Sequence, residues 1–255
     1  MASNNSWLKI FNDYSIFDHD FDDSPFPINA AQIKASCQEF KGVAEKEVRI
    51  LCKQDTRLQR PNVFIENNLF LLPTKNGAYN IVRGEGYVDI PDITSDLITY
   101  DSKLDFELET SKIGNSEMQH LDFAYASSLI RTFMDDPSLV LTIRGRKYTP
   151  EFTFHVNNQK VNVKSVQTEV DAGFEGKDKI VLIEAKNSTT NNTIIRQLFY
   201  PYKQWKVHTD KEVYLLFFEK RGKNYYIWEY IFEDEDDYNS IKLVKSARYK
   251  IKDKE

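Results

Sequence analysis

The stretch VQTEVDAGFEGKDKIVLIEAKN, residues 166–187, decides the fold of this chain. It contains two apolar runs, and each run ends in charged residues where a buried strand normally stays apolar. The first run leads to Glu169 and Asp171, and the second, KIVLI, leads to Glu184 and Lys186. Three carboxylates and a lysine at the ends of neighbouring strands indicate a functional site.

The spacing of these charges predicts which of them meet. Alternate side chains of a strand share one face, so Glu169 and Asp171 point to the same side. In the second strand Glu184 and Lys186 share a face, and Ala185 points away. If the two strands pair, Asp171 and Glu184 converge with Lys186 beside them. Two neighbouring carboxylates repel each other unless a cation or a proton lies between them.

A hard divalent cation is the natural partner of such a carboxylate pair. Mg²⁺ keeps several waters and binds through one or two carboxylates together with substrate phosphate, and the backbone carbonyl of Ala185 can add one more oxygen. A lysine beside the metal can orient or deprotonate an attacking water, or offset charge in a pentavalent phosphorus transition state. We therefore expect phosphodiester hydrolysis with Mg²⁺, for which Mn²⁺ can substitute. The scattered histidines and the two cysteines give other chemistries no comparable support.

Asp171 and the later triplet EAK, residues 184–186, resemble the motif of the PD-(D/E)XK nuclease superfamily, and specifically of its type II restriction endonucleases. Asp171 follows Val170 where the motif has proline, which is a common variation. The helix expected before the motif, the apolar strands that carry its two halves and the helix expected after it resemble the αβββαβ order of that superfamily core. The resemblance covers residues 115–232.

The resemblance implies a role for each motif residue. Asp171 and Glu184 bind the metal with the Ala185 carbonyl, and Lys186 acts on the water. A further acid from the first core helix is best matched by Glu117 and next by Glu109, whereas Glu169 is either a second acid on the metal side or a solvent-facing neighbour. The candidate DNA-binding residues lie on the helix after the motif and in a basic hairpin before it: Arg196, Gln197, Lys203, Arg144, Arg146 and Lys147.

The implied activity is that of a sequence-specific double-stranded DNA endonuclease, a type II restriction enzyme. Palindromic cleavage would imply a homodimer, because two-fold DNA sites are matched by two-fold proteins. A cognate DNA methyltransferase is expected in the same host, without being a physical partner. Two alternatives stay open: a structure-specific nuclease of repair or recombination, and a non-catalytic DNA-binding regulator on a degenerate nuclease fold. The intact Asp, Glu and Lys set argues against degeneration.

The expected fold class is α/β (α+β), with a restriction-endonuclease-like core in which helices flank a central mixed sheet. Residues 1–100 form a smaller α+β region, either a winged-helix-like DNA-recognition or dimerisation module or a plain structural subdomain, and residues 101–255 form the nuclease domain. Within residues 25–40 the pattern predicts a turn with a cap at Asn29 and then a helix. Further helices are predicted over residues 45–54, 115–136 and 193–207, the last interrupted or begun again at Pro201. The pattern also predicts a meander over residues 60–90 and strands over 105–110, 139–149, 151–156, 212–220 and 224–232.

Composition is consistent with this interpretation. In 255 residues, 41% are hydrophobic and 13% aromatic, which describes a folded globular protein. No apolar run approaches the roughly 20 residues of a membrane helix, so a cytoplasmic protein is expected. A net charge of −5 is unfavourable for binding DNA, but residues 18–23 and 233–237 together carry nine acids. Removing nine negative charges from −5 leaves the rest of the chain at +4, which permits a basic face.

Overall fold

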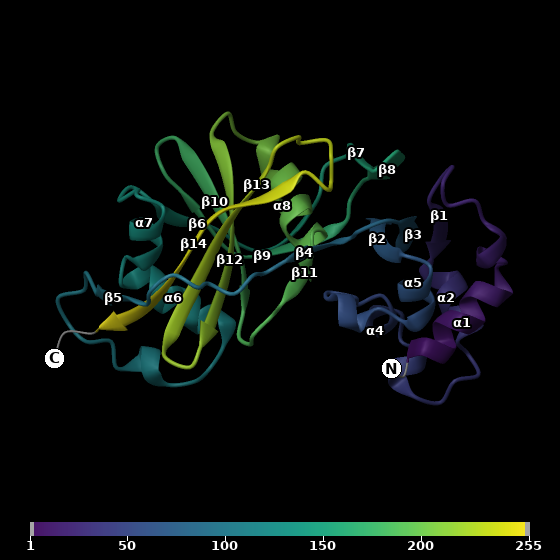
Figure 1. Ribbon diagram of the computed structural model, residues 1–255, viewed down its shortest axis with the longest axis horizontal. Helices are drawn as coiled ribbons and strands as arrows, with labels where there is room; N and C mark the ends of the chain where they lie inside the picture. Colours follow the sequence, from purple (N-terminus) through teal and green to yellow (C-terminus); the bar gives the residue numbers. More distant parts are fainter. Residues whose placement is uncertain (1–2, 253–255) are drawn as a thin grey trace.

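The computed structural model describes residues 3–252 and shows two parts that lie side by side (Figure 1). The smaller part holds the N-terminal helices and a three-stranded sheet, and the larger part is built around a seven-stranded sheet. The fold is therefore mixed α+β, with a large mixed sheet flanked by helices, as the sequence predicted. None of the described helices is long and apolar enough to cross a membrane.

The helices of the smaller part are short and pack around one core. They are α1 (Ser3–Asp13), α2 (Ala30–Ser36), α3 (Val43–Lys46), α4 (Val48–Leu51) and α5 (Asn62–Glu66), with 3-10 turns η1 (Ile16–Asp18) and η2 (Arg57–Gln59). The predicted cap is confirmed, because the Asn29 side chain accepts the Gln32 N–H at 2.9 Å and the Gln32 side chain accepts the Asn29 N–H at 2.9 Å. The predicted helix over residues 45–54 is instead two short helices, separated at the extended residue Glu47.

The sheet of the smaller part is antiparallel, in the order β1-β3-β2. Its strands are β1 (Phe26–Asn29), β2 (Leu69–Lys75) and β3 (Ala78–Arg83), and Gly77, at a φ of 75°, makes the turn between the last two. The predicted meander is confirmed only for this hairpin. Further along, β4 (Tyr87–Asp89) leaves it and pairs with β11 (Asn192–Ile194) in the larger part. The side chains between helices and sheet include Trp7, Phe11, Ile33, Phe64, Leu71 and Ile81.

The large sheet has the order β5-β14-β13-β12-β10-β9-β6. Its strands are β5 (Ile98–Asp101), β6 (Val140–Tyr148), β9 (Gln167–Glu175), β10 (Lys179–Lys186), β12 (Glu212–Arg221), β13 (Asn224–Phe232) and β14 (Ile241–Lys252). The pairs β10–β12 and β14–β5 are parallel and the other pairs are antiparallel. The stretch of residues 166–187 thus supplies two adjacent antiparallel strands near one side of the sheet.

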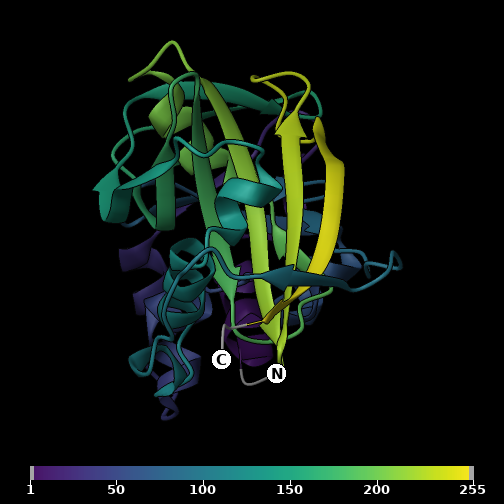
Figure 2. The ribbon, with the colours of Figure 1, turned by 90° about the vertical axis from the view of Figure 1, so that its left-hand side faces the viewer.

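Helices cover both faces of this sheet, which is why β10 is apolar on both sides. Val181 and Ile183 pack in a cluster with α6 (Glu117–Ala126) and α7 (Leu129–Phe133), whereas Ile180 and Leu182 pack in a cluster with α8 (Arg196–Lys206). In Figure 2 the strands run side by side, with α7 in front of them. The alternation of β10 between two buried faces places Glu184 and Lys186 on the side of α8.

Several predicted elements need correction. Residues 105–110 are not a strand; β5 lies before them, and η3 (Thr110–Lys112) begins at the last of them. The predicted helix over 115–136 is broken into α6 and α7 at Ser128, which has a φ of 66°. Met118, near the start of α6, is exposed. Pro201 lies inside α8 without interrupting it. The sequence interpretation did not predict α1, β14 or β8 (Gln159–Val163), the hairpin partner of β7 (Phe152–Val156).

The two parts share a hydrophobic core. Phe70 and Val82 of the small sheet pack with Phe154 of the β7–β8 hairpin and with Phe199 and Tyr200 of α8. The Tyr200 hydroxyl also donates to the Pro73 carbonyl at 2.9 Å. This shared core fixes the position of the smaller part beside the N-terminal end of α8, which matters for the site described next.

Candidate functional site

The two strands of residues 166–187 separate at the point where their charged residues begin. Regular pairing of β9 with β10 ends at Ala172 and Ile183. Beyond it, the Ala185 N–H donates to Oδ2 of Asp171 at 2.8 Å instead of to a strand carbonyl. Because the N–H and C=O of one strand residue point to the same edge, the Ala185 carbonyl faces the same gap. The predicted convergence of Asp171 with the EAK triplet is therefore present.

A β-bulge in β9 sets the direction of Asp171. Val170 pairs with Gly145 and Gly173 pairs with Ile143, so two residues of β9 lie opposite one residue of β6. The extra residue brings Val170 and Ala172 into the cores on opposite faces of the sheet, although regular alternation would keep them together. Asp171 lies between them, at the kink, and its carboxylate points across to β10.

Glu184 is a buried carboxylate whose neighbour is a cation. Its relative exposure is 8%, and the Lys186 ammonium forms an ion pair with its Oε1. Burial, together with the nearby charge of Asp171, raises the pKa of Glu184 to about 7, against the effect of Lys186. Burial lowers the pKa of Lys186, but Glu184, Asp171 and Glu117 outweigh it and leave that pKa raised. Lys186 is therefore a protonated ammonium at neutral pH.

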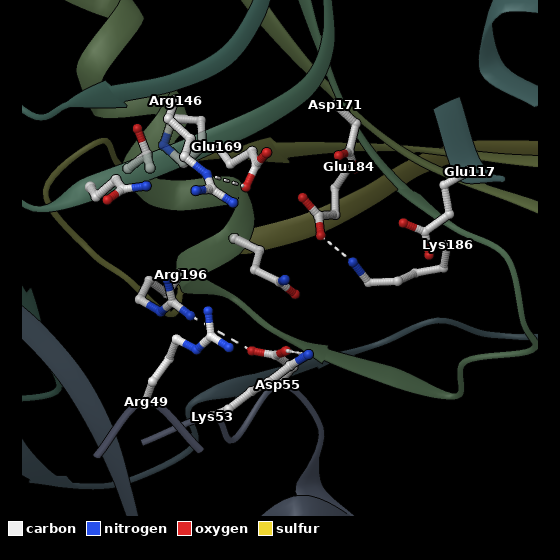
Figure 3. Close-up of a pocket in the computed structure, with 14 residues that line it drawn as sticks. Arg49, Lys53, Asp55, Glu117, Arg146, Glu169, Asp171, Glu184, Lys186 and Arg196 are labelled. Carbon is white, nitrogen blue, oxygen red and sulfur yellow. Dashed lines mark hydrogen bonds and ion pairs between the residues drawn. The ribbon is translucent and has the colours of Figure 1, made fainter. Parts of the chain in front are cut away.

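Asp171 and Glu117 complete the acidic side of the site. Burial raises the pKa of Asp171, although the hydrogen bond from Ala185 and the charge of Lys186 act in the opposite direction. Glu117 begins α6, and its Oε1 accepts the N–H of Asn187, just past β10, at 3.1 Å. This bond ties α6 to the end of the strand, so Glu117 faces the same cavity as Asp171, Glu184 and Lys186 (Figure 3).

The donors in this cavity fit a magnesium ion. Among residues 3–252, no group of three or more His, Cys, Asp or Glu side chains forms a ready metal cage. Two carboxylates, from Asp171 and Glu184, and the Ala185 carbonyl face the gap between the strands. Mg²⁺ rarely uses an all-protein cage and completes its shell with waters and substrate phosphate, so this set of hard oxygen donors suits it.

Of the predicted DNA-binding residues, Arg146, Arg196 and Gln197 line the cavity, which has a volume of about 570 Å³. Arg146 donates to Glu169 at 3.1 Å, so Glu169 lies in the cavity as the partner of an arginine. The Arg196 guanidinium lies 3.7 Å from Asp55.

The other three predicted DNA-binding residues do not line this cavity. Arg144 pairs with Asp122 of α6, and Lys203 lies 2.9 Å from Asp236. The Lys147 ammonium lies 5.8 Å from the centre of the Trp205 ring. Glu109, the second choice for a helical acid, lies before η3 and does not line the cavity either.

The sequence interpretation missed the three charged residues that the smaller part contributes to the cavity: Arg49, Lys53 and Asp55. They come from the smaller part and lie more than a hundred positions before the motif. Nothing in their local pattern distinguishes them from a solvated helix face. Only the shared core between the two parts brings them to the site.

Comparison with known proteins identifies the families. Residues 82–250 match the model of the family described as Domain of unknown function (DUF6997), and the chain belongs to this family. Residues 4–81 match a second model, Domain of unknown function (DUF6996). The two matches meet within β3, whereas the sequence interpretation placed the boundary between residues 100 and 101. No curated protein and no solved structure matches the chain.

Proposed function

We propose that this protein is a Mg²⁺-dependent, sequence-specific endonuclease of double-stranded DNA, of the type II restriction class. The observation that carries the proposal is the hydrogen bond from the Ala185 N–H to Asp171. It joins the two halves of the motif at the gap between β9 and β10, with Glu184 and Lys186 in the same cavity. If the acid and the later ExK triplet occurred in this sequence by chance, nothing would require the two segments to meet in one cavity.

The connectivity around the motif supports a restriction-endonuclease-like core. Along the chain, α6 and α7 are followed by β6, β9 and β10, then by α8 and β12. The four strands are neighbours in the order β6-β9-β10-β12, and α8 connects the parallel pair β10 and β12. This is the αβββαβ order implied by the resemblance, with the β7–β8 hairpin inserted between the first two strands and β11 before the helix.

The acids of the motif and Glu117 have distinct roles in this proposal. Asp171, Glu184 and the Ala185 carbonyl would hold Mg²⁺, which, when bound, polarises the phosphoryl oxygen and lowers the pKa of a bound water. Glu117 fixes the end of β10 through Asn187, so it orients the EAK segment. In the reaction, the oxygen of water forms a bond to phosphorus, one P–O ester bond breaks, and a phosphate monoester and a hydroxyl result.

The protonation state of Lys186 limits the roles that this residue can take in the reaction. Its raised pKa keeps it as an ammonium, so it is a poor general base and a good hydrogen-bond donor. In the proposal Lys186 orients the attacking water and offsets the negative charge that develops on the phosphoryl oxygens. Arg146 and Arg196 lie in the same cavity and suit flanking phosphates.

The decisive experiment does not require the recognition sequence to be known in advance. Methylated and unmethylated genomic DNA is incubated with the protein and Mg²⁺ or Mn²⁺, and the new ends are sequenced. A constant sequence at the ends supports a restriction enzyme, and paired cuts in both strands support a homodimer. Cleavage of branched substrates alone would point to a repair or recombination nuclease. Binding of duplex with no cleavage in either metal would refute the nuclease proposal.

A further inference from the structure

The cavity that holds the carboxylates has a second wall, which the smaller part supplies. Arg49 of α4 lines this wall with Lys53 and Asp55, which follow the helix. Figure 3 shows these three residues on one side of the cavity and the acids of β9 and β10 on the other. Arg196, from the start of α8, reaches toward the same wall and pairs with Asp55.

The charges on this wall are not balanced. Three cations, Arg49, Lys53 and Arg196, line the cavity beside only one carboxylate of the smaller part, that of Asp55. Its oxygens lie 3.7 Å from Lys53 Nζ and 3.7 Å from an Arg196 terminal nitrogen, which is longer than the roughly 2.7–2.9 Å of a charge-assisted hydrogen bond. Among the described residues, Arg49 has no ion-pair partner, and the buried Arg196 Nε has no hydrogen-bond partner.

This excess of positive charge suits a phosphate. Arginine presents a planar fork of donors that matches phosphate oxygens, and two arginines with a lysine offer more donors than one carboxylate can satisfy. The N-terminal end of an 11-residue helix, α8, adds positive potential, because its first two residues, Arg196 and Gln197, line the cavity.

The shape favours a chain of phosphates over a single small anion. A second cavity, of about 390 Å³, includes the same wall and continues away from the acids to Lys75, at the end of β2. The two cavities share Arg49, Lys53, Asp55, Gln167 and Arg196. A groove between the smaller part and the large sheet therefore leads from the carboxylates past the basic wall.

We propose that Arg49, Lys53 and Arg196 bind an internal phosphodiester of the DNA strand that is cleaved at Asp171 and Glu184. The Asp55 carboxylate occupies this phosphate subsite in the free protein, and the DNA phosphate displaces it. The inference rests on the proposed nuclease function and gives the smaller part a share in holding the substrate backbone. Substitutions of neighbouring residues are therefore expected to change DNA affinity in opposite directions. Removal of the Arg49 or Lys53 side chain weakens DNA binding, and removal of the Asp55 charge strengthens it.

Binding is measured apart from cleavage, with a fluorescently labelled duplex of arbitrary sequence in EDTA, over a range of KCl concentrations. Phosphate contacts carry no sequence information, so an arbitrary duplex is sufficient. The variants are Arg49→Ala, Lys53→Ala and Asp55→Asn. Lys46→Ala is the matched control, because Lys46 lies in the neighbouring helix α3, is exposed and does not line either cavity. Thermal unfolding of each variant verifies that it is folded.

The expected result is a clear difference in salt dependence. Loss of one phosphate contact lowers the slope of log K against log salt concentration by about 1, so Arg49→Ala and Lys53→Ala give lower slopes and weaker binding than Lys46→Ala. Asp55→Asn binds several-fold more tightly than the natural protein. Equal slopes for Arg49→Ala and Lys46→Ala, or weaker binding by a folded Asp55→Asn, would overturn the inference.

Cleavage assays separate this inference from the function on which it rests. If the natural protein cuts DNA and the Arg49→Ala variant binds DNA as tightly as the natural protein, the phosphate subsite is refuted and the nuclease function is not. Absence of cleavage by the natural protein refutes the function, whatever the binding data show. A loss of cleavage by Arg49→Ala on circular plasmid supports an internal phosphodiester. A loss confined to 5′-phosphorylated linear DNA would instead assign the subsite to a terminal phosphate.

Discussion

Replacement of Glu184 by glutamine is expected to change how the stability of the protein depends on pH. Burial raises the pKa of this carboxyl group from 4.5 to about 7, so between these values the folded protein keeps a proton that the unfolded chain releases. The stabilising effect of that proton is complete below the unfolded-state pKa and disappears as the pH rises through the folded-state pKa. Without metal, the natural protein therefore loses stability as the pH rises from 5 to 8.

The size of the effect follows from the shift. Integration of the difference in bound protons from about pH 5 to about pH 8 gives a loss of about 2 to 3 kcal/mol in unfolding free energy. Glutamine has a similar shape and does not titrate, so Glu184→Gln should lack this component. The raised pKa of Asp171 acts in the same direction in both proteins and cancels to first order in the comparison.

The assay is urea unfolding in EDTA at both pH values, for the natural protein and Glu184→Gln. Glu169→Gln is the matched control, because Glu169 lines the same cavity but its side chain is 56% exposed. The control should keep the pH dependence of the natural protein. If Glu184→Gln also keeps it, Glu184 does not titrate near neutral pH and the argument from its burial is wrong.

Three further predictions test the site and its support. Asp171→Asn and Lys186→Ala should abolish Mg²⁺-dependent cleavage of plasmid while duplex binding, measured by anisotropy, is retained; full activity in either variant would remove that residue from the mechanism. Calorimetric titration should show Mg²⁺ binding more tightly at about pH 8 than at about pH 6, with proton release, because the metal needs ionised Glu184; equal affinity at both would contradict this role. Gly173→Ala should cost about 1 to 3 kcal/mol in urea unfolding, since its Cβ would lie 2.6 Å from the Ile143 Cβ, and an unchanged unfolding midpoint would show that β6 can move aside.

The elements that the sequence predicted correctly are those whose hydrophobic pattern reflects burial in the core. The apolar runs before Glu184 and in residues 212–232 are buried strands, and the helix around Leu121 packs on one face of the sheet. The sequence interpretation missed β14 because only one of its 12 residues is buried and basic side chains are interspersed along it. Its place depends on β13 and β5, which pair with it on either side.

The basic wall of the cavity could not be predicted for a different reason. Arg49 and Lys53 follow no pattern that distinguishes a ligand-facing cation from an exposed one. Their position depends on the packing of Phe70 and Val82 against α8, which is a contact between residues more than a hundred positions apart. Local sequence patterns do not contain that information.

The motif of Asp171 and residues 184–186 could be predicted from the sequence in part. Regular alternation predicted that Glu184 and Lys186 share a face, and the Lys186–Glu184 ion pair agrees with that. The same rule places Ala172 on the face of Val170, but the bulge moves it to the opposite core and leaves Asp171 at the kink. A regular β9 would continue to pair with β10 and would leave no gap beside Ala185. Because the strand pairing has stopped here, a cavity has opened beside both carboxylates. Patterns that assume regular strands therefore identify the residues of the site but not the irregularity that directs Asp171 toward Ala185.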